Sequence, residues 1–213
     1  MKSHCVINLR LVLPLMLLPF ASFASISAQS PIDGIDARAN TADLAKQLGS
    51  PDPLLRQRSA EALARLVATD QRKLVEGYQL QEKNKEVRLA LDWALYRMGK
   101  SDALFRIVKE LDSGRQQQAV GYLSELETPD LLYPFLKKAN NPSRVTAGLL
   151  KAFARLGDGQ TLDLIKPYRE SLEPNVAHSA ETACDEIEKR MGQETTSPTR
   201  VRPRTVEKPR QQQ

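Results

Sequence analysis

The sequence predicts an all-α fold, a right-handed α-solenoid of about five helical-hairpin repeats, on three observations. Between Asn40 and Gly192 apolar residues recur at spacings of three and four, the period of amphipathic helices. No stretch of this region alternates apolar and polar residues as a half-buried strand does. Five segments end in similar runs whose last residues are 32, 28, 30 and 31 residues apart. A period of this size is typical of stacked helical pairs, each too small to bury its apolar face alone.

The similar runs mark the second helix of each predicted pair. They cover residues 62–66, 94–98, 122–126, 152–156 and 183–187. When the runs are aligned, Cys184 takes the position of Leu63, Leu95, Leu123 and Phe153. We therefore expect Cys184 to be a core residue, since a buried cysteine behaves as a small apolar side chain.

A first helix is expected before each second helix. Its apolar stripe begins at a leucine, and these leucines are Leu44, Leu74, Leu104, Leu132 and Leu162. The residues placed to cap the N-termini with a side-chain oxygen are Thr41, Asp70, Ser101, Thr128 and Asp158. Pro129 then falls in a first turn, where proline is tolerated. Residues 49–53, 113–114 and 140–142 have the composition of turns, which separates the paired helices.

Parts of the repeat resemble a known family of helical repeats. Residues 131–142 (LLYPFLKKANNP) resemble the first helix and turn of a HEAT repeat, including its proline within the helix. Residues 50–56 (SPDPLLR) and 86–88 (EVR) are similar to the start of its second helix. The resemblance covers residues 40–192, with a period shorter than the ~40–47 residues of HEAT or armadillo units. It is closer to the compact bacterial version grouped with phycobilisome lyase-type repeats.

The N-terminus has the order of a secretory signal peptide. Lys2 and Arg10 precede an apolar run over residues 11–28 that ends in small residues. Cleavage is expected between Ser25 and Gln29, which predicts a periplasmic or secreted protein with no transmembrane span after cleavage. The alternative, an uncleaved anchor, is disfavoured because Pro14 and the shortness of the apolar core do not suit a spanning helix of ~20 residues.

Four segments follow from this reading: a signal peptide (1–28), a lead-in (29–39), the HEAT-like repeat domain (40–192) and a disordered basic tail (193–213). Residues 29–192 carry 24 Lys and Arg against 24 Asp and Glu, whereas the tail carries five basic and two acidic residues. A neutral body gives no reason to expect nucleic-acid binding. The tail is either a solvated extension or a segment that contacts anionic lipid, polysaccharide or an acidic protein.

The sequence after the signal peptide lacks the patterns of catalytic and metal sites. It has one histidine, His178, and one cysteine, Cys184, so neither a transition-metal site nor a disulfide framework is expected. There is no glycine-rich phosphate loop and no serine nucleophile elbow. The pair Asp92-Trp93 is similar to part of HEAT-like DNA glycosylases, but a neutral body and an export signal argue against DNA repair. We expect no enzyme and no cofactor.

Two functions remain after these exclusions. Stacked helical pairs form an extended, curved surface suited to a peptide, a helix or a protein domain. The leading hypothesis is an exported HEAT-repeat interaction or scaffold protein that binds a protein or peptide partner in the cell envelope. The alternative is an accessory protein in a modification or lyase reaction that depends on that partner.

The binding residues are predicted from the register of the second helices. Five positions before the end of each run stand Glu61, Trp93, Gly121, Lys151 and Thr182, a mostly polar column expected to face solvent. One turn further on stand Arg65, Arg97, Glu125, Arg155 and Glu186. Because Trp and Arg are enriched in binding hot spots, the candidates for partner binding are Trp93, Arg97, Lys151, Arg155, Arg65 and Glu61. The alternative for Trp93 is a place in the core between helices.

Overall fold

The computed structural model describes residues 35–196, which contain helices and no strand and belong to one compact unit. The prediction of an all-α protein is confirmed. No helix in this part of the chain is both long and apolar enough to cross a bilayer. The predicted signal peptide (1–28), the start of the lead-in and most of the basic tail lie outside the described residues.

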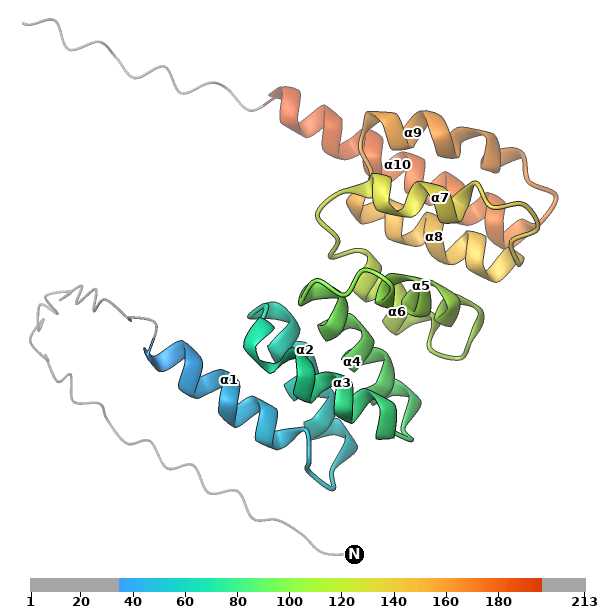
Figure 1. The fold of residues 1–213 in the computed structure, drawn as a ribbon. Helices are drawn as coiled ribbons and strands as arrows, with labels where there is room; N and C mark the ends of the chain where they lie inside the picture. The colour runs from blue at the N-terminus through green and yellow to red at the C-terminus, as the bar shows by residue number, and fades with distance from the viewer. Residues whose placement is uncertain (1–34, 197–213) are drawn as a thin grey trace, which may run out of the picture. The chain divides into compact units, whose positions relative to one another are not determined.

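Ten α-helices follow one another through residues 35–196 (Figure 1). Their bounds are α1 Ile35–Gln47, α2 Pro53–Arg65, α3 Arg72–Gln81, α4 Lys85–Arg97, α5 Ala103–Lys109, α6 Gln116–Leu123, α7 Tyr133–Leu136, α8 Ser143–Leu156, α9 Gly159–Ile165 and α10 Pro174–Thr196. Four short 3-10 turns precede or extend the odd-numbered helices: η1 Thr69–Gln71, η2 Glu110–Asp112, η3 Pro129–Leu132 and η4 Lys166–Glu170.

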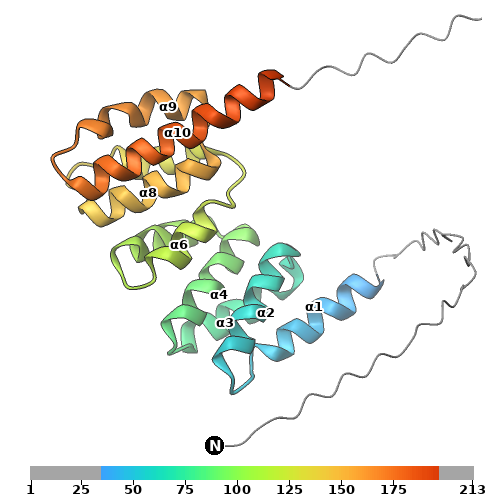
Figure 2. The same ribbon diagram turned by 180° about the vertical axis from the view of Figure 1, so that it is seen from behind.

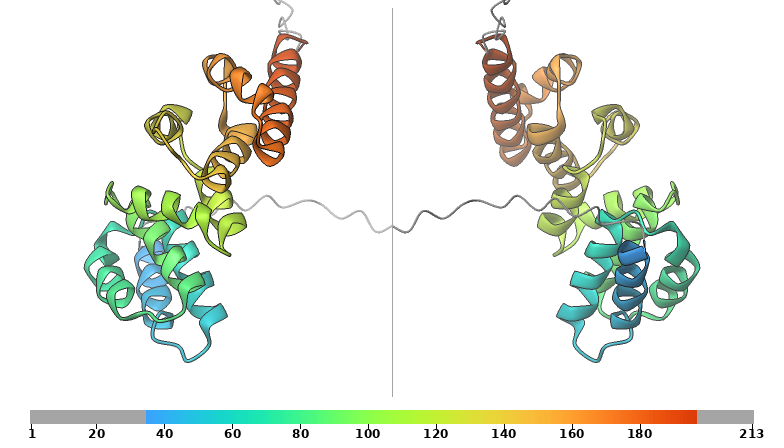
Figure 3. Two further views of the ribbon diagram at one scale, coloured as in Figure 1. Left: turned by 90° about the vertical axis from the view of Figure 1, so that its right-hand side faces the viewer. Right: turned by 90° about the vertical axis from the view of Figure 1, so that its left-hand side faces the viewer.

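The even-numbered helices contact one another in chain order. α2 packs on α4, α4 on α6, α6 on α8, and α8 on α10. Most odd-numbered helices pack against the even helix that follows, as α3 does on α4 and α9 on α10. Figure 2 shows the succession from α2 to α10 from one side, and Figure 3 shows it from two further directions.

Burial agrees with the predicted register of the second helices at one aligned position. The second residue of each of the five runs is buried, and these residues are Leu63, Leu95, Leu123, Phe153 and Cys184. Burial raises the pKa of the Cys184 thiol, so this side chain has little thiolate character at neutral pH. The prediction that Cys184 is a core residue is correct.

The predicted helix caps were only partly right. Asp158 caps α9, where its Oδ1 accepts a hydrogen bond of 2.8 Å from the backbone N–H of Thr161. The predicted cap Thr41 is wrong because α1 begins at Ile35, inside the predicted lead-in. The side chains of Asp70, Ser101 and Thr128 accept no capping bond. α3 and α5 are entered from residues in helical conformation, whereas a side-chain cap requires an extended one.

Gly148 sets the approach of α8 to the chain before it. A Cβ at this position would lie 2.8 Å from Leu111 Cδ2 and 3.3 Å from Leu111 Cβ. Leu111 is itself buried, so it cannot move aside without disturbing the core.

Gly148→Ala is therefore expected to lower the free energy of unfolding by about 1–3 kcal/mol through overpacking. Gly77→Ala is the matched control, since no atom lies within 4 Å of its Cβ position in α3. That variant should gain about 0.5–1 kcal/mol, the usual advantage of alanine over glycine in a helix. Urea unfolding of both variants measures the difference, and equal effects would contradict the close packing at Gly148.

Candidate partner-binding surface

Trp93 is buried, with 2% of its surface exposed, so the hypothesis that it is an exposed binding anchor is wrong. Its ring stacks on Tyr96 at 5.7 Å between centroids and on Tyr122 of α6 at 5.5 Å with an interplanar angle of 1°. The covering side chain is unusual in the repeat. The residue equivalent to Tyr122 is alanine in the other four runs, namely Ala62, Ala94, Ala152 and Ala183.

Hydrogen bonds between polar side chains join Tyr122 of α6 to Glu61 of α2. The Tyr122 hydroxyl donates to Glu61 Oε1 at 2.6 Å and accepts from Gln118 Nε2 at 2.9 Å. Gln57 Nε2 donates to the same Glu61 oxygen at 3.0 Å. Burial, together with the hydrogen bond to Glu61, raises the pKa of Tyr122, which keeps the phenol protonated as a donor. Glu61 is thus held in a fixed position and not left as a free surface carboxylate.

A cavity of about 270 Å³ opens over this network. It is lined by Glu61, Arg65, Trp93, Gln118, Gly121, Tyr122 and Glu125. Three predicted site residues, Glu61, Arg65 and Trp93, therefore share one cavity. The buried, stacked rings of Trp93 and Tyr122 form part of its lining, while the exposed side chains of Arg65 and Glu125 place opposite charges at its rim.

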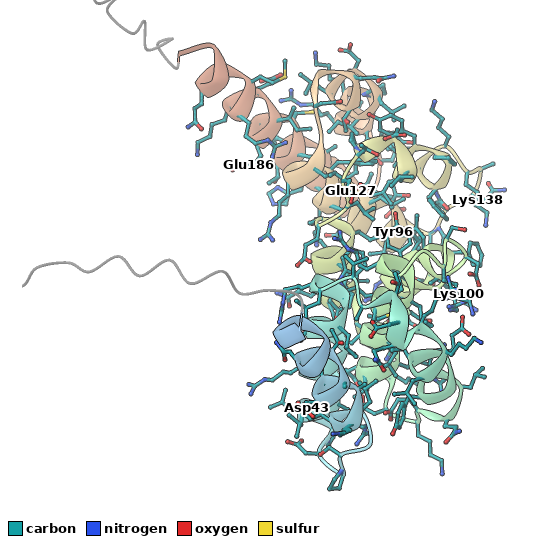
Figure 4. The ribbon with its side chains drawn as sticks, turned by 60° about the vertical axis from the view of Figure 1, so that its left-hand side comes forward. Asp43, Tyr96, Lys100, Glu127, Lys138 and Glu186 are labelled. Carbon is teal, nitrogen blue, oxygen red and sulfur yellow. The ribbon has the colours of Figure 1, made fainter. Side chains whose placement is uncertain are left out.

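A larger cavity of about 440 Å³ lies where α2, α4 and α6 end. Its lining residues are Val67, Tyr96, Arg97, Gly99, Ser101, Leu126, Glu127, Thr128 and Leu131. Tyr96 and Glu127 are labelled in Figure 4. The guanidinium of Arg97 lies 5.7 Å from the centre of the Trp93 ring. Arg97 therefore connects the stacked aromatic cluster to this second cavity.

Lys151 and Arg155 do not join either cavity. Both side chains are exposed on α8, as the register predicted for that column. They line neither of the two cavities described above. The six candidates thus divide into four residues gathered around α2 and α4 and two that stand apart on α8.

Asp92, next to Trp93, faces the odd-numbered helices. Its Oδ1 accepts from Arg106 Nε of α5 at 2.7 Å and from Gln79 Nε2 of α3 at 3.1 Å. Burial raises the pKa of Asp92, and the hydrogen bond and charge of Arg106 oppose that rise. Because the carboxylate is enclosed by these partners, it joins three helices and is not aimed into the cavities beside Trp93.

The side chains that line the two cavities are aromatic, apolar and charged. Within residues 35–196, no three His, Cys, Asp or Glu side chains are grouped to hold a metal ion. His178, the histidine singled out from the sequence, is exposed on α10, in agreement with its interpretation as a surface residue. Together the two cavities are lined by aromatic side chains, two arginines and several carboxylates, which suits hydrogen bonding and charge pairing with a ligand.

Comparison of the chain with protein-family models and with curated proteins finds no match.

Proposed function

We propose that this protein is an exported interaction or scaffold protein that binds a protein or peptide partner in the cell envelope through the surface of α2, α4 and α6. The observation that carries the proposal is the pair of neighbouring cavities on these helices, joined by Trp93, Tyr96 and Arg97. Export rests on the N-terminal sequence pattern alone.

The order of helix contacts supports the proposal of a solenoid of HEAT-like repeats. Each even-numbered helix packs on the next, which is the contact pattern that stacked helical pairs produce. The buried, aligned residues of the five runs agree with a repeated unit. Such stacks carry their binding surfaces on a continuous row of helices.

The side chains at the cavities support a partner that is itself polar and charged. Arg65 and Glu125 are exposed, and neither forms an ion pair with another described residue. Charges of this kind at a rim steer association and select a partner more than they add affinity. The buried stack of Trp93 and Tyr122 beneath them keeps the surface rigid, which limits the entropy lost on binding.

Charge reversal at the rim tests the proposal. Tagged chain should recover a specific protein from an envelope extract, and Arg65→Glu should weaken binding of that protein about tenfold because the reversed charge repels the partner group. Lys73→Glu is the matched control, since Lys73 is an exposed base on α3 that lines neither cavity. Both variants should keep the melting temperature of the wild-type chain.

Two outcomes would contradict the proposal. Equal recovery by the wild type and by both variants would place the binding surface elsewhere. A recovered partner whose intact mass shows a covalent change that depends on this chain would favour an accessory role in a modification reaction.

A further inference from the structure

The larger cavity contains a residue in a backbone conformation that its side chain disfavours. Val67 has a φ of 48°, in the left-handed region that β-branched residues rarely adopt. It follows the last turn of α2, where its N–H donates to Ala64 O at 3.1 Å and the next N–H, of Ala68, donates to Leu63 O at 3.2 Å. These two hydrogen bonds form a Schellman motif at the end of the helix. The position that Val67 takes in this motif is usually occupied by glycine.

The next repeat has glycine at the same point. Gly99 follows α4 with a φ of 92°, and the same pair of bonds closes that helix, from Gly99 N to Tyr96 O and from Lys100 N to Leu95 O, each at 2.9 Å. Valine at position 67 is thus not required by the turn. Its side chain is 41% exposed and lines the cavity, so it presents apolar surface there at the expense of the helix end.

The rest of the cavity is lined by further apolar side chains and by charges of both signs. Leu131 is 38% exposed and supplies a second apolar side chain, with buried Leu126 and half-buried Tyr96 nearby. Arg97 and Glu127 add one charge of each sign, and neither pairs with an opposite charge among residues 40–193. The volume of about 440 Å³ falls within the ~300–1,000 Å³ of ligand pockets.

We propose that this cavity binds an extended peptide segment of the partner that inserts one aliphatic side chain between Val67 and Leu131, with an acidic residue for Arg97 and a basic residue for Glu127. The inference rests on the proposed function and names the kind of segment that this surface recognises. In this proposal the Val67 side chain contacts that segment, which accounts for a valine where the turn favours glycine.

The test begins with a displayed library of random short peptides selected on the full chain. Enriched peptides should share an aliphatic residue flanked by an acidic and a basic residue. For a synthetic peptide of that sequence, Val67→Gly and Leu131→Ser should each weaken binding about tenfold, the scale of an anchor contact. Leu80→Ser is the matched control, because Leu80 is an exposed leucine of α3 outside the cavity and its loss should leave affinity unchanged.

Two readouts separate binding from a structural effect. Val67→Gly should raise the melting temperature while it weakens binding, since glycine suits the left-handed turn. Glu127→Lys should weaken binding of the peptide, and changing the basic residue of the peptide to glutamate should restore it.

Failure of this inference can be told from failure of the proposed function. Peptides whose binding depends on Arg65 and not on Val67 or Glu127 would overturn the inference and leave the proposed surface standing. No enrichment of any peptide, together with no effect of Arg65→Glu on partner recovery, would overturn both.

Discussion

Replacing Trp93 with alanine is expected to lower the free energy of unfolding by about 3–5 kcal/mol, the loss typical of a large buried aromatic residue. The indole is enclosed by Tyr96 and Tyr122, so its removal leaves a cavity and breaks two ring contacts. It also removes the surface on which Arg97 rests. Chemical denaturation of the wild type and the variant measures the loss.

Fluorescence provides an independent check on the same residue. Trp93 is the only tryptophan of the chain, so the emission of the native protein reports its environment alone. We expect blue-shifted emission that resists aqueous quenchers. Trp93→Phe should lose less stability than Trp93→Ala, because a smaller aromatic ring still fills part of the site. Red-shifted, readily quenched emission and an unchanged melting temperature in Trp93→Ala would mean that the residue is exposed.

Arg106→Ala is expected to cost about 3 kcal/mol of stability near neutral pH, because it leaves the buried Asp92 carboxylate without its cationic partner. Asp92 is 5% exposed, and Gln79 would be its remaining side-chain donor. Asp92→Asn should be much milder, since the amide oxygen can accept the same two hydrogen bonds. Arg106 keeps a second partner in that variant, because its Nη1 donates to Asp102 Oδ2 at 2.9 Å.

The loss in Arg106→Ala should depend on pH in a defined direction. Burial already raises the pKa of Asp92 in the folded protein, and without Arg106 that pKa rises further. The folded state then binds a proton more tightly than the unfolded state, whose aspartate has a pKa of about 3.9. The loss of stability should therefore be small near pH 4. It should grow as the pH rises, until the pH exceeds the raised pKa of Asp92 in the folded variant. Urea titrations at several pH values measure this, and a deficit independent of pH would show that lost packing dominates.

The sequence predicted those parts of the fold that follow from helical periodicity. The alignment of Cys184 with Leu63 and Phe153 held because a residue facing the core in one unit faces it in the next. Capping was predicted less well, since the same residue types also occur in turns. Asp52 and Asn84, which cap α2 and α4 through their side chains, were not among the expected caps.

The sequence predicted some of the residues that line the candidate site but not how deeply Trp93 is buried in it. Of the residues that the register placed on ridges next to Trp93, Glu61 and Arg65 share a cavity with it, whereas Lys151 and Arg155 do not. The register could not show that Trp93 is covered. That depends on one ring, Tyr122, placed from the next even-numbered helix. Periodicity assigns a residue to a face of its own helix and contains no information on how deeply a neighbour covers that face.

Contacts between distant parts of the chain could not be predicted either, because periodicity gives no information on which helices become neighbours. The carbonyls of Ala154 and Gly157 at the end of α8 each accept a hydrogen bond of 2.6 Å from Arg190 of α10. Nothing in the local pattern around Arg190 distinguishes it from an ordinary solvated base. Its role becomes visible only when the two helices are in place.

The hydrogen bond from Tyr122 to Glu61 has a consequence for how the molecule opens. It joins residues 61 positions apart and ties α2 to α6, although α4 packs against both. An array held by nearest-neighbour contacts alone can lose its units one at a time from an end. Here detachment of α2 would remove the acceptor from a buried phenol, so we expect α2, α4 and α6 to open as one cooperative block. Amide protons in these three helices would then exchange at a shared rate.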